Sequence, residues 1–391
     1  MSHDFVDGPT PRSRRSRLLL LLQLPPPVHG ASLMNEYLVH AAWLQTDYEV
    51  VVVPLQFAES VGDIGRARIA KMLKLLGIWG AIAQACVARR PSLAYFTMAP
   101  TGPAFWRDLT LVALLRSFRV PIVFHLHGKG LANGRVLRPR RICYRWAFKR
   151  SVVIQLSAGL QEEVKGIVPQ SRSRIVPNGV PDLFEREPIP VREARQGFPR
   201  VLFLSNMVRE KGVFDLLDAI ALLRDEGLSA NVTYVGPFLS TASRNEFFRS
   251  VSLLALDDRV HWAGPAYGEC RRAYLAAADV FVFPSYYGPE AFPLVVLEAL
   301  AAGLPVVGAR TGAIPEIIDN GRTGIVVSPR DPEALAVALG TLLRDPAMRR
   351  RMGEAGRAKY LMEYGLHRYL GRMRSILAEC VRETTPELAG R

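Results

Sequence analysis

The segment Glu290-Ala-Phe-Pro-Leu-Val-Val-Leu-Glu298 continues into an apolar run that ends at Val307. Seven residues separate its two carboxylates. Pro293, between them, suits the start of a helix, where a missing N–H costs nothing. The sequence therefore predicts Glu290 on the loop that enters a helix and Glu298 about one and a half turns inside it. A rise of about 1.5 Å per residue separates the two by roughly 8 Å along the helix axis.

This spacing suits a grip on one elongated polar ligand at two points better than two acids that share a proton. The backbone N–H groups at the helix start, together with the positive end of the helix dipole, can hold a phosphate between the glutamates. Glu298 stands in an otherwise apolar helix, where an unpaired charge is expensive. Hydroxyl groups at both ends and a diphosphate in the middle indicate a sugar nucleotide as the ligand.

Short apolar runs alternate with longer amphipathic segments along all 391 residues, a length that favours two domains. Two successive sets of βα units with nearly continuous apolar strands predict an α/β protein with two doubly wound, Rossmann-like parallel sheets. The predicted strands are 18–24, 48–54, 93–97, 122–127, 152–156, 174–176, 201–205, 231–235, 260–262, 280–284, 305–309 and 324–327.

The predicted domain bounds follow composition. Residues 1–16 are expected to be a disordered basic tail, 17–177 the first domain and 200–360 the second. Residues 178–199 are rich in Pro, Glu and Arg and show no helix or strand pattern, which predicts a linker. In such an architecture the ligand binds in the cleft where strand C-termini of both domains face each other.

The net charge of +14 is concentrated in the first half of the chain. Residues 1–199 hold 27 Lys/Arg against 14 Asp/Glu, or 27 − 14 = +13, whereas residues 200–391 hold 23 against 22. Two segments, 135–150 and 66–79, interleave cations with aromatic or aliphatic residues, as helices on anionic membranes do. We expect a membrane surface or a lipid-linked acceptor, with plain solvated faces as the alternative. No nucleic-acid-binding motif is present, so no nucleic-acid partner is expected.

The expected location is the cytoplasm, peripheral to the inner face of the plasma membrane. The four cysteines lie far apart without metal-type spacing, which is typical of free thiols in a reducing compartment. The leucine run 18–22 is too short for a secretion signal, and no stretch approaches the ~18 apolar residues of a membrane span.

Three positions outside the first segment point to the same ligand. Gly30 follows a strand and a proline-rich turn, so a phosphate can approach its backbone closely; an ordinary turn glycine is the alternative. Lys211 stands at a helix start, where a cation is unfavourable unless an anion binds there. His125 and His127 end a predicted strand on one sheet face and run into Gly-Lys-Gly at 128–130, at the edge of the expected cleft.

Together these motifs resemble, in order and spacing, the retaining glycosyltransferases with the GT-B fold, of the family 4 or glycosyl transferases group 1 type. The resemblance covers about residues 17 to 380 and is strongest over 176–325. Besides the paired glutamates, the matching motifs are Leu304-Pro-Val-Val, Gly312-Ala-Ile-Pro-Glu316, Asn320-Gly-Arg-Thr-Gly324, Val176-Pro-Asn-Gly-Val180 and Pro25-Pro-Pro-Val-His-Gly30.

The resemblance implies a role for each matching residue. Glu290 would contact the donor hexose, Glu298 the ribose hydroxyls and Lys211 the diphosphate, while His127 rather than His125 would contact the transferred sugar or the reacting hydroxyl. The expected catalytic residues are His127, Lys211 and Glu290. The expected donor-binding residues are Gly30, Asn206, Arg209, Lys211, Glu290, Ala291, Phe292, Pro293, Leu294 and Glu298.

One position departs from the family pattern. The family's usual arginine, five residues before the lysine, is Asn206 here, which can donate hydrogen bonds but brings no charge. We therefore expect the leaving group to depend more on Lys211 and on the helix start at 292–294, with Arg209 as a partial substitute. Glu316 is expected to be a residue of a helix first turn.

The expected activity is transfer of a hexose from a UDP- or GDP-sugar to a glycan or lipid-linked acceptor, in cell-surface polysaccharide or glycoconjugate synthesis. The family also implies a closing helix, within 361–391, that crosses back to the first domain. No cofactor and no metal are expected beside the nucleotide sugar, since the sequence has no Asp-x-Asp pair. The alternatives are a nucleotide-sugar epimerase of related fold, which lacks an acceptor site, and a non-catalytic sugar-nucleotide-binding protein, which Asn206 makes conceivable.

Overall fold

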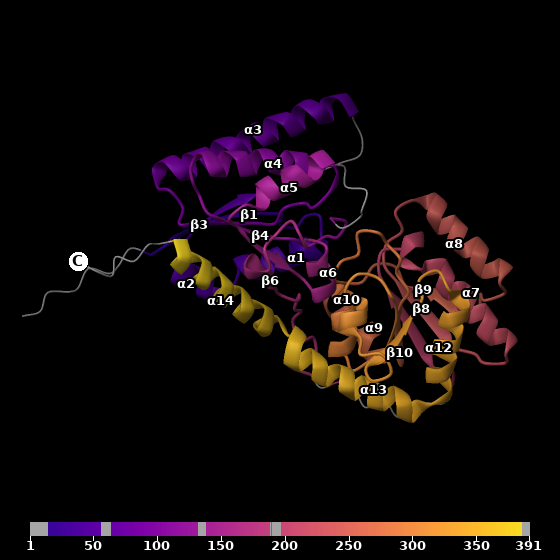
Figure 1. Cartoon of the computed structure of the whole chain (residues 1–391). Helices are drawn as coiled ribbons and strands as arrows, with labels where there is room; N and C mark the ends of the chain where they lie inside the picture. Colours follow the sequence, from indigo (N-terminus) through magenta and orange to yellow (C-terminus); the bar gives the residue numbers. More distant parts are fainter. Residues whose placement is uncertain (1–14, 56–63, 132–137, 188, 190–196, 385–391) are drawn as a thin grey trace, which may run out of the picture. The chain divides into compact units, whose positions relative to one another are not determined.

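The structure, a computed structural model, describes residues 15–55, 64–131, 138–187, 189 and 197–384. These residues form two parallel β-sheets of six strands each, with helices between the strands (Figure 1). The first sheet has the order β2-β1-β3-β4-β5-β6 and the second the order β12-β11-β10-β7-β8-β9. The prediction of an α/β protein with two such sheets is confirmed.

Strands form where the apolar runs predict them. The strands of the first sheet are β1 (Arg17–Leu22), β2 (Glu49–Pro54), β3 (Leu93–Phe96), β4 (Ile122–His125), β5 (Val152–Gln155) and β6 (Ser173–Ile175). Those of the second are β7 (Arg200–Leu204), β8 (Asn231–Val235), β9 (Val260–Trp262), β10 (Val280–Phe283), β11 (Val306–Ala309) and β12 (Gly324–Val327). The prediction that His127 ends a strand is wrong, because pairing of β3 with β4 stops at Phe124 and the chain turns toward the glycines of 128–130.

The helices connect these strands. Along the described chain they are α1 (Gly30–Val39), α2 (Ala42–Asp47), α3 (Ile64–Ala88), α4 (Gly102–Ser117), α5 (Arg138–Phe148), α6 (Ala158–Glu162), α7 (Val213–Asp225), α8 (Thr241–Leu253), α9 (Gly268–Ala277), α10 (Leu294–Ala301), α11 (Ile314–Ile317), α12 (Pro332–Arg344), α13 (Pro346–Lys359) and α14 (Leu366–Thr384). A 3₁₀ turn, η2 (Arg209–Lys211), precedes α7, and a π-helical turn, η3 (Tyr360–Tyr364), joins α13 to α14.

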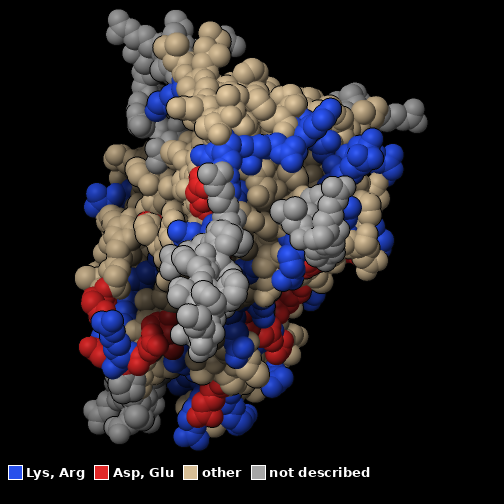
Figure 2. All heavy atoms as spheres, turned by 90° about the vertical axis from the view of Figure 1, so that its left-hand side faces the viewer, with Lys and Arg blue, Asp and Glu red and all other residues tan. Residues whose placement is uncertain are grey.

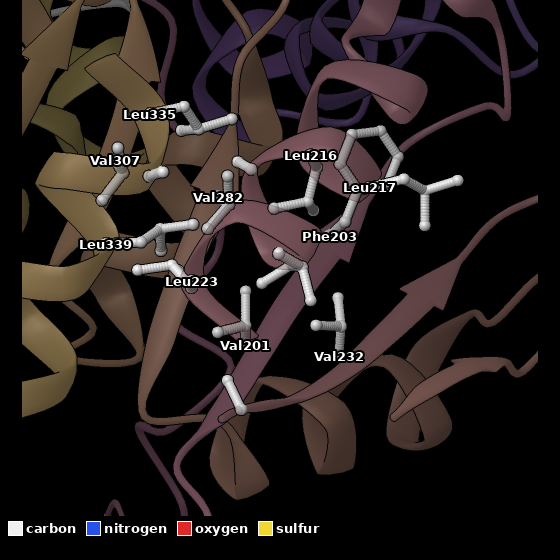
Figure 3. Close-up of a cluster of buried hydrophobic side chains, with 14 of the residues drawn as sticks. Val201, Phe203, Leu216, Leu217, Leu223, Val232, Val282, Val307, Leu335 and Leu339 are labelled. Atoms are coloured by element: carbon white, nitrogen blue, oxygen red, sulfur yellow. The ribbon is translucent and has the colours of Figure 1, made fainter. Parts of the chain in front are cut away.

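The second sheet is covered by α7 and α12, which pack against each other (Figure 3). Leu216, Leu217 and Leu223 of α7 and Leu335 and Leu339 of α12 are buried. Each such side chain contributes about 1.5–3 kcal/mol on burial. This packing makes the second sheet a rigid support for the loops at its strand ends. Its core residues drawn with labels are Val201, Phe203, Leu216, Leu217, Leu223, Val232, Val282, Val307, Leu335 and Leu339.

The chain divides into two compact units, which are described separately. One comprises Met1–Thr97, Leu109–Phe124 and Arg374–Arg391, and the other Met98–Asp108 and His125–Met373. Within the first unit, Arg374 of α14 pairs with Asp47 at 2.8 Å, so the end of the C-terminal helix packs against N-terminal residues. The domain bounds predicted from the sequence, 17–177 and 200–360, each enclose one sheet and differ from the bounds of these two units. They stay a prediction. The predicted tail 1–16 lies almost entirely outside the described residues.

The segment after β6 packs against α13 and the residues that follow it, within the unit that contains His125–Met373. Asp182 forms an ion pair with Arg357 of α13 at 2.5 Å, and Val180 forms an isolated bridge with Gly365. Gly179 fits there because a Cβ atom would come within 2.8 Å of the Gly365 carbonyl oxygen. The described part of the predicted linker, 178–199, contains no helix or strand.

Candidate active site

The loop from β10 to α10 presents both glutamates of the opening segment. Glu290 lies on this loop, and Glu298 lies in the second turn of α10. Pro293 is the N-cap of α10 rather than its first helical residue, with an extended backbone at ψ 117°. An N-cap contributes its carbonyl to the helix, and Val296 donates to the Pro293 oxygen at 3.2 Å, so the missing N–H costs nothing there either.

Lys211 and Glu290 form an ion pair across the end of the second sheet. Gly212, just after Lys211, has a positive φ of 82°, and a Cβ atom there would lie 2.5 Å from the Pro284 oxygen. The backbone of the turn is therefore pressed against the end of β10, which directs Lys211 toward the loop. The Lys211 and Glu290 side chains are only 16% and 11% exposed, so each charge depends on the other.

Neighbouring backbone holds the Glu290 loop in place. A Cβ atom on Gly312, at φ 54°, would lie 2.4 Å from the Glu290 carbonyl oxygen. Ala313 donates its N–H to the Ala291 oxygen at 2.8 Å, and the Asn178 side chain donates to the Phe292 oxygen at 3.4 Å. The backbone from Glu290 to Phe292 is thus fixed from two sides before any ligand binds.

Glu298 is paired with Arg271, which projects from α9. Their side chains are 13% and 21% exposed. Burial raises the pKa of the Glu298 carboxyl above its ordinary value of 4.5, and the Arg271 charge and hydrogen bond oppose that shift. Sequence reasoning missed Arg271. The apolar neighbours of Glu298 indicate that a partner is needed, but they do not say which of many arginines supplies it.

Asn206 and Arg209 follow the end of β7. Asn206 is exposed, with its carbonyl accepting from the Val208 N–H at 2.8 Å. Arg209 pairs with Glu246 of α8 at 2.5 Å and lies 4.1 Å from the centre of the Phe214 ring. Both contacts border a cavity of about 230 Å³ between η2 and α8. The role of Arg209 as a partial substitute for the family's arginine stays a prediction.

His127 lies on the loop after β4, which is held by hydrogen bonds. Glu163 accepts from the backbone N–H of Gly130 at 2.6 Å and of Leu131 at 3.0 Å. His125 is fully buried, with its ring centre 4.1 Å from that of His127. Burial, with a smaller effect of His127, lowers the pKa of His125 well below its ordinary value, so His125 is neutral at pH 7.

Gly30, in the other unit, is the exposed first residue of α1, and His29 caps that helix by accepting from the Ser32 N–H at 3.2 Å. Among the predicted site residues, Lys211 and Glu290 meet directly, and Ala291 to Pro293 continue the loop into Leu294, the first residue of α10. The roles that the resemblance implies for all these residues stay predictions. Glu316 lies in the first turn of α11, as expected, and its carboxylate accepts from the N–H groups of Ala158 and Gly159 of α6 at 2.9 and 2.8 Å.

The described residues contain neither a candidate metal site nor a candidate membrane-spanning helix. No group of three or more His, Cys, Asp and Glu side chains among them is placed to hold a metal ion. No helix in the same residues combines the length and the apolar character that crossing a bilayer requires.

The region that carries Lys211, Glu290 and Glu298 is similar to known proteins. Residues 185–359 match the model described as "Glycosyl transferases group 1". The glycogen synthase of Mycobacterium tuberculosis is 28% identical over 268 residues, which cover 65% of this chain and 62% of that protein. The GDP-mannose-dependent alpha-(1-6)-phosphatidylinositol monomannoside mannosyltransferase of Mycolicibacterium smegmatis is 36% identical over 166 residues, or 41% of this chain and 42% of that one.

The chain thus spans less than two thirds of the length of these relatives. Among solved structures, Anabaena HepE in complex with UDP superposes with a TM-score of 0.72 at 20% identity, over 93% of this chain and 100% of that one. Residues 185–359 thus resemble the glycosyl transferases group 1 family, and the two parallel sheets form the GT-B fold.

Proposed function

We propose that the protein is a retaining glycosyltransferase that transfers a hexose from a UDP- or GDP-sugar to a glycan or lipid-linked acceptor. The observation that supports this most is the pairing of Lys211 with Glu290 on a loop that leads into the helix of Glu298. The cation and the helix start suit the diphosphate of a nucleotide sugar. The two carboxylates suit its hexose and its ribose. Relatives whose names specify GDP-mannose or whose structures hold UDP support both donor classes.

In the proposed reaction Glu290 positions the hexose, and Lys211 with the first backbone N–H groups of α10 stabilises the leaving diphosphate. The bond from the anomeric carbon to the phosphate oxygen breaks as the acceptor oxygen bonds to that carbon from the same face. The departing phosphate takes the acceptor's proton, so no side chain acts as a strong base. Lys211 and the helix start supply the positive charge, and we propose no metal.

We further propose that basic helices bring the protein to an anionic membrane on the cytoplasmic side, for cell-surface glycoconjugate synthesis. Helix α5 exposes Arg140, Arg141 and Arg145 beside Ile142 and Trp146, which are 68% and 40% exposed. Helix α3 exposes an apolar set as well: Met72, Leu73, Leu76, Trp79 and Val87. Exposed apolar side chains among cations are typical of helices that lie on anionic lipid surfaces.

Basic and acidic side chains are unevenly distributed on one face of the molecule (Figure 2). Figure 2 shows that basic side chains gather with few acidic ones in the upper part of the face it presents, whereas both kinds mix in the lower part. The name of the Mycolicibacterium smegmatis relative specifies a lipid acceptor, a phosphatidylinositol mannoside. These features support a lipid-linked acceptor over a soluble one. The four cysteines form no disulfide among the described residues, which fits a reducing compartment.

A binding screen tests the donor part of this proposal. Isothermal titration of the purified protein with UDP, GDP and their glucose and mannose conjugates should give saturable binding for one nucleotide class. Lys211→Met should weaken that binding at least about tenfold, because a lost charge-assisted contact is worth about 1.5–3 kcal/mol. If neither nucleotide class binds the wild-type protein, the proposed function is wrong.

A further inference from the structure

Arg271 is the charged group that contacts Glu298 from a neighbouring helix. It projects from α9 and forms an ion pair with one oxygen of the Glu298 carboxylate, Oε2. The flanking Leu297 and Ala299 are fully buried. A carboxylate in such surroundings takes up a proton unless a cation compensates its charge. The pairing therefore determines whether Glu298 is charged at neutral pH.

Other charged or titratable groups near Glu298 already have partners. Burial raises the pKa of the Tyr360 hydroxyl in η3, and the charge of Glu298 adds a smaller contribution in the same direction. That hydroxyl donates to the Val180 oxygen at 2.9 Å. Arg357 of α13 reaches the Ala301 oxygen of α10 at 2.8 Å but is paired with Asp182. The counter-charge for Glu298 therefore comes from α9.

We infer that Arg271 is a positioning residue of the donor site: its guanidinium holds one oxygen of Glu298 and leaves the other free to accept from the ribose hydroxyls. A charged carboxylate accepts hydrogen bonds about twice as strong as a neutral one does. Arg271 would act on the nucleotide through Glu298, without touching the reacting atoms. Because the contact of Glu298 with the ribose is itself part of the proposed function, the test must separate the two.

The next residue on the same helix provides a matched control. Arg272 pairs with Glu187 and, at 2.7 Å, with Glu269, and its side chain is 20% exposed against 21% for Arg271. Arg271→Met and Arg272→Met thus remove the same charge from adjacent positions of α9. A general effect of charge or helix stability would appear in both variants, whereas the inferred role appears in the first alone.

The first measurement is the Kd for UDP and GDP between about pH 5.5 and 8.5. Without Arg271 the pKa of Glu298 rises further, so its charged form, and with it tight binding, is reached only at higher pH. We expect Arg271→Met to weaken binding about tenfold near pH 6, with recovery as pH rises, since a one-unit pKa shift gives a tenfold change. Arg271→Lys should restore part of the affinity, and Arg272→Met should behave as wild type. A parallel wild-type and Arg271→Met profile would overturn the inference.

The second measurement needs no nucleotide. In Arg271→Met the folded-state pKa of Glu298 lies above its unfolded value, so this carboxyl favours the folded state at low pH and loses that contribution as pH rises. The melting temperature of Arg271→Met should therefore fall with pH more steeply than that of Arg271→Met/Glu298→Gln. Equal slopes would contradict the inference even if the wild-type protein binds a nucleotide. Failure of the wild type to bind either nucleotide, with unequal slopes, would overturn the proposed ribose contact and leave the pairing intact.

Discussion

At the scale of single residues, the site contains two ion pairs, and the proposed donor rearranges only that of Lys211 with Glu290. Lys211 and Glu290 neutralise each other in a largely buried position, and breaking such a pair leaves an uncompensated charge. A bound diphosphate would replace Glu290 as the partner of Lys211 and leave the glutamate free for the hexose hydroxyls. The charge of Lys211 would thus have an anionic partner both without and with the proposed donor.

Lys211→Met should lower donor turnover by at least about 100-fold, because one charge that stabilises the transition state is lost. Initial rates of nucleoside diphosphate release measure this effect. Lys165→Met is the matched control, since Lys165 is exposed and paired with Glu162 on the surface. Comparable losses in both variants would show that Lys211 has no special part in the reaction.

Glu298→Gln should weaken nucleotide binding by about 1–3 kcal/mol, through loss of charge-assisted hydrogen bonds. It should also remove the pH dependence, because the wild-type affinity rises with pH as the raised pKa of Glu298 is passed and glutamine does not titrate. Titration calorimetry at several pH values measures both effects. Glu269→Gln, a change on the exposed side of α9, is the control. Unchanged nucleotide affinity in Glu298→Gln would exclude the ribose contact.

The residues of the site differ in how far the sequence predicts them. Lys211 and Glu290 are both expected at the donor site from motif order, but their direct ion pair is a finding of the structure. Glu298 pairs with Arg271 of α9, and Arg209 pairs with Glu246 of α8. The local sequence pattern around Glu298 and Arg209 does not indicate which side chains of other helices they contact. Long-range pairs between side chains are therefore what the sequence leaves undetermined.

At the scale of elements, the donor loop depends on a close approach of two backbones. Gly312→Ala should place a Cβ atom 2.4 Å from the Glu290 oxygen and push the loop outward. Gly321→Ala is the matched control, because Gly321 also has a positive φ, 80°, but its Cβ would meet nothing within 4 Å. Backbone strain of about 1 kcal/mol is common to both.

We expect Gly312→Ala to reduce donor affinity at least about tenfold, because the shifted loop moves Glu290 out of alignment with Lys211. Gly321→Ala should keep the wild-type donor affinity. Thermal unfolding of both variants measures the shared cost of strain. If donor affinity falls equally in the two variants, the loop is not held through Gly312.

Elements were predictable where one physical pattern dominates. The strands inside the two sheets follow from buried apolar runs, since a parallel strand covered on both faces needs them, whereas the edge strands β6 and β9 are only partly buried. Element ends are set by interactions that the pattern does not contain. His127 lies beyond β4, which ends at His125 and pairs with β3 only as far as Phe124, and Pro293 caps α10 instead of entering it.

At the scale of the whole molecule, charge separates the first half of the chain from the second. Replacing Arg140, Arg141 and Arg145 by Gln should weaken binding to phosphatidylglycerol vesicles by about 3 kcal/mol in total, at about 1 kcal/mol per cation near the surface. Vesicle co-sedimentation measures this loss, and circular dichroism checks the fold. Replacing the exposed Arg322, Arg350 and Arg351 removes equal charge from the second half and should change little. Equal losses of vesicle binding in the two triple variants would show that binding depends on net charge alone and not on α5.

The most direct test of the central claim is turnover of a nucleotide sugar. The protein is incubated with UDP- and GDP-hexoses, with and without bacterial lipid extract, and products are followed by proton NMR of the anomeric signals. We predict release of the nucleoside diphosphate that depends on the extract, and a product that keeps the anomeric configuration of the donor. An inverted product would contradict the retaining mechanism. An isomerised donor would indicate an epimerase, and a donor left intact with every acceptor would contradict the claim that this protein is a glycosyltransferase.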